Sequence, residues 1–254
     1  PLDTLSERLA DQVDDRTSCV LVSSVLFGTG LIVPELQQIA AACTKHGAEM
    51  MVDAYHSLGV VPFSLDGMEQ AFVLGGGYKY MQLGEGNCFM RVPEGCEMRP
   101  VITGWFSEFA ELADAKTEGE VRYGKGFMRF SGSTFDPTSQ YRGAAVLDFF
   151  AEQGLSTELL RSVSQHQVGL LVETLESLDL DPAMVSIDAG VPLESRAGFL
   201  TVRAPDAEAL SVALREHGVS TDARGDRLRF GPAPYLSDAQ VVQAMETLRE
   251  VVPR

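Results

Sequence analysis

The sequence predicts an α/β protein with a mostly parallel sheet, because strand and helix patterns alternate along its first part. Residues 19–22 and 50–52 form short, continuous apolar runs, which are typical of strands buried in parallel sheets. Between them, Pro34 begins a helical segment that extends to about His46, and Gly47 follows as a common helix stop. This strand–helix–strand order favours a doubly wound sheet.

Composition excludes several classes of protein. The chain has 254 residues, 45% of them hydrophobic, which is enough for one large or two small domains. Its 36 acidic and 20 basic residues give a formal net charge of −16, which argues against a nucleic-acid surface. No apolar run approaches the roughly 18 residues of a membrane span, and the first residues lack the pattern of a signal peptide.

The four cysteines show neither metal-ligand spacing nor a dense disulfide framework. We therefore expect a cytoplasmic protein with reduced thiols, without a metal site. Three regions are expected along the chain, and the last of them has predicted strands at residues 199–202, 219–221 and 228–230. The regions are part of a large α/β domain (1–95), a loop region with connecting helices (96–180) and a small C-terminal α+β domain (181–254).

A carboxylate and an amine follow two of the predicted strands. Asp53 comes directly after residues 50–52, and Lys79 follows the apolar run at residues 71–74. Because parallel strands end at the same edge of a sheet, both side chains would project into one crevice, where open α/β sheets bind ligands. An enzyme that uses pyridoxal 5'-phosphate (PLP) needs these groups, the amine to bind the aldehyde and the carboxylate to keep the pyridine nitrogen protonated. The alternatives are a loop lysine at Lys79 and a turn or helix-cap residue at Asp53.

Residues 53–56 (DAYH), 78–80 (YKY) and 84–86 (GEG) resemble the core of kynureninase and its nearest class V aminotransferase-fold relatives. The resemblance implies a fold type I PLP-dependent transferase-like fold, with a mostly parallel sheet sandwiched by helices and a small C-terminal α+β domain. It also implies that Asp53 meets the pyridine nitrogen and that Lys79 carries PLP. The resemblance covers nearly all of this chain but only the later portion of the family's sequence. Either an N-terminal segment was removed, or another chain supplies it, or this is a degenerate relative.

The resemblance assigns further cofactor contacts. It implies that His56 lies beside Asp53, that Tyr78 contacts the phosphate and takes part in proton transfer, and that Ser23 holds the cofactor. It also implies that Trp105 reaches the phosphate from a neighbouring subunit. Each residue has a plain structural alternative: an ordinary core or surface histidine, a packing tyrosine, a serine that closes a turn, and a core indole with its N–H satisfied.

Two residues are expected to bind the substrate. Residues 228–235 (LRFGPAPY) resemble the family segment whose arginine holds the substrate α-carboxylate, so Arg229 is assigned that role. A planar guanidinium suits bidentate carboxylate binding, whereas the alternative is an outward-facing arginine on an edge strand. Around Thr134 the chain departs from the family, which often has an asparagine, or a threonine followed by prolines, to hold the aromatic amino-ketone. Thr134 keeps a hydroxyl there, so it is assigned to the substrate and the cofactor.

If the resemblance extends to activity, the reaction is a step of tryptophan catabolism. It is the hydrolytic cleavage of the Cβ–Cγ bond of L-kynurenine, or 3-hydroxykynurenine, to anthranilate and L-alanine. Lys79, Tyr78 and Asp53 are then the expected catalytic residues, and a homodimer with shared active sites is expected. The alternatives are a class V aminotransferase or lyase acting on another amino acid, and a PLP-fold remnant without catalysis.

Overall fold

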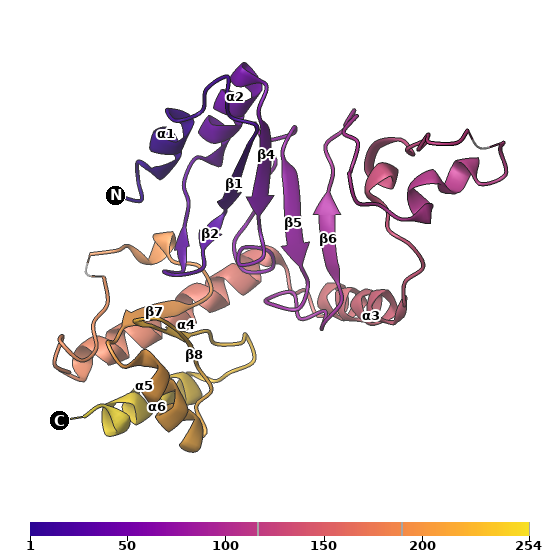
Figure 1. The fold of residues 1–254 in the computed structure, drawn as a ribbon. Coiled ribbons are helices and arrows are strands. Elements are labelled where there is room, and N and C mark those ends of the chain that lie inside the picture. Colours follow the sequence, from indigo (N-terminus) through magenta and orange to yellow (C-terminus); the bar gives the residue numbers. More distant parts are fainter. Residues whose placement is uncertain (116, 189, 254) are drawn as a thin grey trace.

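The computed structural model describes residues 1–115, 117–188 and 190–253. Its largest sheet has four strands in the order β1-β4-β5-β6 (Figure 1). The pairs β1–β4 and β4–β5 are parallel, and β6 runs antiparallel to β5. The bounds of these strands are Cys19–Ser23 (β1), Glu49–Asp53 (β4), Phe72–Gly76 (β5) and Cys88–Arg91 (β6). The expected mostly parallel α/β sheet is confirmed.

Two helices, α1 (Leu5–Ala10) and α2 (Leu36–His46), cover one face of this sheet (Figure 1). Gly47 ends α2 in the left-handed region at φ 67°, a conformation that costs glycine no steric strain. The helices and strands share a hydrophobic core because their apolar residues face each other. Its most buried members are Ile39, Cys43, Met50, Val52, Ala54 and Ala71.

The first strand is less buried than its apolar sequence predicts. Val22 is buried, but the side chain of Leu21 is 68% exposed. β1 is the edge strand of the sheet, and successive strand residues point to opposite faces. Only the face under α1 and α2 is therefore buried at β1 in this structure, so the expected continuous burial of residues 19–22 is wrong.

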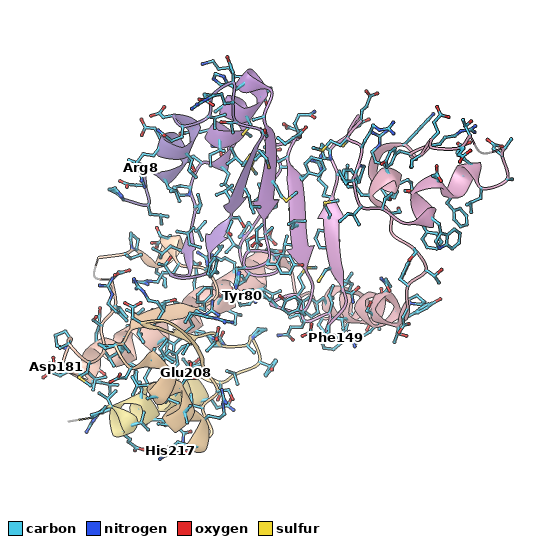
Figure 2. The ribbon with its side chains drawn as sticks, in the orientation of Figure 1. Arg8, Tyr80, Phe149, Asp181, Glu208 and His217 are labelled. Atoms are coloured by element: carbon cyan, nitrogen blue, oxygen red, sulfur yellow. The ribbon has the colours of Figure 1, made fainter. Side chains whose placement is uncertain are left out.

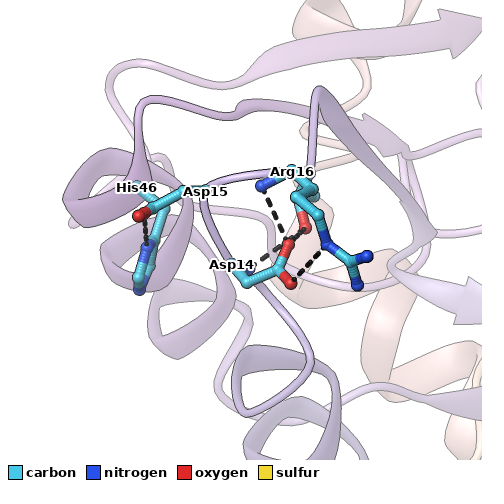
Figure 3. Close-up of polar contacts among 5 residues, drawn as sticks. Asp14, Asp15, Arg16 and His46 are labelled. Atoms are coloured by element: carbon cyan, nitrogen blue, oxygen red, sulfur yellow. Dashed lines mark hydrogen bonds and ion pairs between the residues drawn. The ribbon is translucent and has the colours of Figure 1, made fainter.

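Polar contacts join the loop before β1 to the end of α2 (Figure 3). His46 Nδ1 lies 2.7 Å from Asp15 Oδ1, and the Asp14 carboxylate accepts hydrogen bonds from Arg16 N at 3.0 Å and Arg16 Nε at 3.3 Å. These contacts are exposed, so they fix the course of the loop more than they stabilise the fold. After β1 the chain forms a short antiparallel pair, β2 (Val25–Leu26) and β3 (Leu31–Ile32).

The middle of the chain lies beyond β6 and then returns along the carboxyl end of the sheet (Figure 1). Ser156 caps the longer of its two α-helices, since its Oγ accepts a hydrogen bond from Leu159 N at 3.2 Å. The elements are the 3₁₀ segments η1 (Trp105–Glu111) and η2 (Gly126–Phe130) and the helices α3 (Thr138–Glu152) and α4 (Thr157–Ser177).

The C-terminal part has its own antiparallel sheet, in the order β7-β9-β8, and its own core. Leu200, Leu214, Leu228, Met245 and Leu248 are fully buried in that core. The elements are η3 (Leu193–Ser195), β7 (Leu200–Arg203), α5 (Ala207–Glu216), β8 (Asp222–Arg224), β9 (Arg227–Phe230) and α6 (Asp238–Val251).

The strand predicted at residues 219–221 is wrong, because β8 begins at Asp222. Val219 N donates to Leu214 O at 2.9 Å and thereby closes the end of α5. Thr221 O accepts a hydrogen bond from Ser211 Oγ at 3.2 Å, again on α5. These backbone groups are therefore engaged by the helix and do not join the strand ladder.

A small apolar cluster connects the two parts. Its buried residues are Val25, Val60, Val61, Ala197 and Phe199. Ala197 N donates to Gly30 O at 2.8 Å, and Gly30, at φ 72°, lies so close to Phe199 that no Cβ fits. The β2–β3 hairpin is thereby held against the start of β7. None of the helices among the described residues is long and apolar enough to cross a membrane, and the four cysteines are free thiols.

Candidate active site

Asp53 lies at the carboxyl edge of the large sheet, where β1 and β4 end side by side. Ser23 is its partner in the strand register, and Ser23 Oγ lies 3.4 Å from Asp53 Oδ2. Tyr55 N donates to Asp53 Oδ1 at 2.9 Å. The carboxylate is thus oriented by one serine hydroxyl and one backbone N–H just beyond the end of its strand.

Lys79 follows β5, the neighbouring parallel strand, after three glycines. Gly76 packs against the ring of Tyr55 and Gly77 against Leu83, and neither position has room for a Cβ. The pKa of Lys79 is lowered, first by burial and then by the positive charge of Arg229, whereas Asp53 raises it. The amine therefore lies within electrostatic reach of both residues, and its neutral form is easier to reach than that of an exposed lysine.

A pair of tyrosine rings begins at the lysine amine. Lys79 Nζ lies 5.1 Å from the centroid of the Tyr78 ring, and the rings of Tyr55 and Tyr78 are 5.8 Å apart, nearly edge to face. The pKa of Tyr55 is raised to about 12, first by its hydrogen bond with Cys88 and then by burial. The Tyr55 phenol therefore keeps its proton at neutral pH.

Arg229 approaches the same place from the C-terminal sheet, and its side chain is only 15% exposed. Its Nη1 donates to Phe27 O at 2.8 Å, and its Nη2 forms an ion pair with Asp222. The guanidinium lies 5.6 Å from the centroid of the Phe199 ring, which is also 5.6 Å from the His56 ring. A cavity of about 370 Å³ opens here, and His56, Lys79 and Arg229 all line it.

Similarity to known proteins agrees with this geometry. Residues 160–248 match the model of the kynureninase C-terminal domain. A kynureninase from Pseudomonas fluorescens is 28% identical over 255 residues, which cover 98% of this chain and 59% of that protein. The chain is kynureninase-like. It spans about three-fifths of the length of this relative.

Solved structures identify the fold of the kynureninase-like chain as fold type I of the PLP enzymes. The complex of the cystine C-S lyase C-DES with cysteine persulfide superposes with a TM-score of 0.78 at 21% identity, covering 98% of this chain and 65% of that one. A structure of SPT with PLP has a TM-score of 0.62 at 17% identity, covering 98% and 58%. That SPT structure contains PLP, the cofactor that the sequence of this chain predicts.

The residues of the kynureninase-like chain fit this cofactor. A partly buried amine with a lowered pKa and a hydrogen-bonded carboxylate lie at the ends of adjacent parallel strands, within electrostatic reach of each other. The amine suits an aldehyde, and the carboxylate suits a pyridine nitrogen. On the turn of the β2–β3 hairpin, the Thr29 hydroxyl is buried and has no hydrogen-bond partner among the described residues.

His56 should titrate near pH 4 instead of near 6.5. Burial and the positive charges of Lys79 and Arg229 lower its pKa to about 4, although Asp53 opposes them. His56 is therefore expected to be neutral between pH 5 and 7, and to gain its proton only as the pH falls toward 4. An NMR titration of the four histidines, with His56→Gln to assign the signal, measures this. A His56 signal with a midpoint near 6.5 would contradict the prediction.

Trp105 and Thr134 lie elsewhere. Trp105 is the first residue of η1, a segment that lies beyond β6 in Figure 1. The centroid of its ring is 4.3 Å from that of the Phe106 ring. Thr134 is exposed in the segment that follows Gly132, whose carbonyl accepts a hydrogen bond from Phe106 N at 3.0 Å. Neither residue lines the cavity around Lys79. The two residues share one loop region, which is separate from the site of their own chain.

Several residues that line the cavity were not predicted from the sequence. Tyr80, Gln82, Phe199 and Asp222 line the cavity, and Tyr80 lies where the sheet meets the C-terminal part (Figure 2). Burial raises the pKa of Tyr80, so its phenol stays protonated. The pairing of Tyr80 with Gly198, where no Cβ fits, is a contact between distant segments. No local sequence pattern indicates it.

Proposed function

We propose that the chain is the PLP-dependent, kynureninase-like hydrolase predicted from the sequence. It would cleave the Cβ–Cγ bond of L-kynurenine, or 3-hydroxykynurenine, to give anthranilate and L-alanine, as a cytoplasmic enzyme of tryptophan catabolism. The carrying observation is that Lys79, Arg229 and His56 line one cavity at the carboxyl edge of the sheet, with Asp53 within electrostatic reach. In the relative from Pseudomonas fluorescens, the activity belongs to a longer protein, of which this chain covers 59%.

PLP, when bound, would withdraw electrons from the substrate Cα. Lys79 would hold the cofactor and, once released, move the Cα proton, because its lowered pKa makes a neutral amine accessible. Asp53 would keep the pyridine nitrogen protonated, held by Ser23 Oγ and Tyr55 N. Tyr78, whose ring lies against the lysine amine, would support proton transfer.

Arg229 would hold the substrate α-carboxylate. Its largely buried guanidinium faces the cavity that Lys79 also lines. This arrangement fits a ligand whose carboxylate and amine are attached to the same carbon. His56, neutral at pH 7, would pack beside the cofactor ring without adding positive charge next to Lys79. Ser23 would contribute a hydroxyl on the side of Asp53.

A homodimer is part of this proposal, with Trp105 and Thr134 serving the partner's site. The support is that several large apolar side chains of the same loop region are exposed, since exposed apolar surface marks interfaces. The exposed side chains of this surface are Val101, Ile102, Trp105, Phe109, Phe127 and Phe135.

The test is a comparison of substrates on the purified chain incubated with PLP. Production of anthranilate from L-kynurenine, with no sulfide from L-cysteine and no transamination of L-alanine with a 2-oxoacid, is the expected result. A visible absorption band that borohydride fixes onto Lys79 is expected with it. Turnover of cysteine or alanine alone would replace the hydrolase with a lyase or an aminotransferase. The absence of band, label and turnover would reject the enzyme proposal.

A further inference from the structure

We propose that Asp222 is a built-in competitor for Arg229, which occupies the guanidinium until a carboxylate ligand enters the cavity. The inference rests on the proposed function in one respect, that Arg229 is the carboxylate-binding residue. It adds a residue that opposes this binding and thereby sets its strength.

The strand pairing places the two side chains together. Asp222 and Arg229 are register partners on the antiparallel strands β8 and β9, and cross-strand partners on one face are close neighbours. Arg229 Nη2 pairs with the Asp222 carboxylate, while Nη1 donates to Phe27 O at 2.8 Å. Both side chains also line the cavity that contains Lys79. A carboxylate ligand that enters the cavity therefore finds Arg229 already paired with the carboxylate of Asp222.

The two partners differ in how easily they can move. The side chain of Arg229 is 15% exposed and is anchored by Phe27 O, whereas that of Asp222 is 47% exposed. Asp222 also has a second cationic neighbour, since Arg224 Nε lies 3.6 Å from its Oδ1. Asp222 can therefore turn toward Arg224 and solvent, while Arg229 stays in place to receive the ligand.

This arrangement lowers the affinity of the site for every carboxylate by the free energy of the displaced ion pair. Selection among carboxylates then depends on contacts elsewhere in the cavity, such as those of Phe199 and Tyr80. A neutral residue at position 222 would remove the competition and leave the arginine fork intact.

The test measures carboxylate binding directly and needs neither cofactor nor turnover. Propionate is titrated into the wild-type chain and Asp222→Asn, and the shifts of the backbone amide NMR signals of β8 and β9 give the dissociation constants. Propionamide serves as the uncharged probe. The matched control is Asp226→Asn, which removes the same charge from the same hairpin but breaks a pair with Arg227, 3.4 Å away, instead of the pair with Arg229.

Asp222→Asn should bind propionate about fivefold more tightly than the wild-type chain, the effect of losing one partly exposed ion pair. Asp226→Asn should match the wild type, propionamide should show no gain, and Arg229→Leu should abolish binding. Asp222→Ser provides a second variant if the asparagine disturbs the strand. Unchanged or weaker binding in both Asp222 variants, or undetectable binding in every variant, would overturn the proposal. Tighter binding without kynurenine turnover would uphold it and reject only the hydrolase activity.

Discussion

Lys79→Ala should abolish both the borohydride label and turnover, with a rate at least about 10³-fold lower. The amine is assigned two roles, attachment of the cofactor and movement of the Cα proton, and alanine can perform neither. Its lowered pKa, caused first by burial and then by Arg229, suits both roles. Visible spectra, peptide mapping after borohydride reduction and the rate of anthranilate release measure the outcome.

Two companion variants sharpen this experiment. Lys45→Ala removes an exposed lysine from α2, far from the cavity in sequence, and should leave band, label and rate unchanged. Lys79→Arg keeps a positive charge whose pKa is too high for a neutral form, and should be as inactive as alanine. A label that persists in Lys79→Ala would show that another amine holds the cofactor.

Arg229→Leu should raise the KM for L-kynurenine about 100-fold with a smaller change in kcat. Two charge-assisted hydrogen bonds to a carboxylate are worth about 3 kcal/mol, which corresponds to that factor in affinity. Because the loss concerns the α-carboxylate, which does not react, it should appear mainly in KM. Steady-state kinetics and the affinity of a carboxylate inhibitor measure it.

The same variant has a second readout that a general loss of structure would not give. The positive charge of Arg229 lowers the pKa values of both Lys79 and His56, so its removal should raise the His56 midpoint above about 4. Arg227→Leu is the matched control on the same strand, because Arg227 pairs with Asp226 and does not line the cavity. An equal loss in both variants would contradict the assignment of Arg229.

The sequence alone determines several of the elements and where the acid and the amine lie along them. The strands predicted from residues 50–52 and 71–74 and the helix stop at Gly47 are encoded within a few neighbouring residues, and the structure confirms them. The positions of Asp53 and Lys79 follow from the same local patterns, because a parallel sheet brings the ends of its strands to one edge.

Only the tertiary structure decided which distant groups meet at that edge. Arg229 donates to Phe27 O, 202 residues away in the chain, and its partner Asp222 was predicted to lie outside the strand that carries it. The exposure of Leu21 likewise depends on which face of the sheet is covered. Local sequence sets periodicity and capping, but such pairings arise from packing between elements that are far apart along the chain, and no short pattern encodes them.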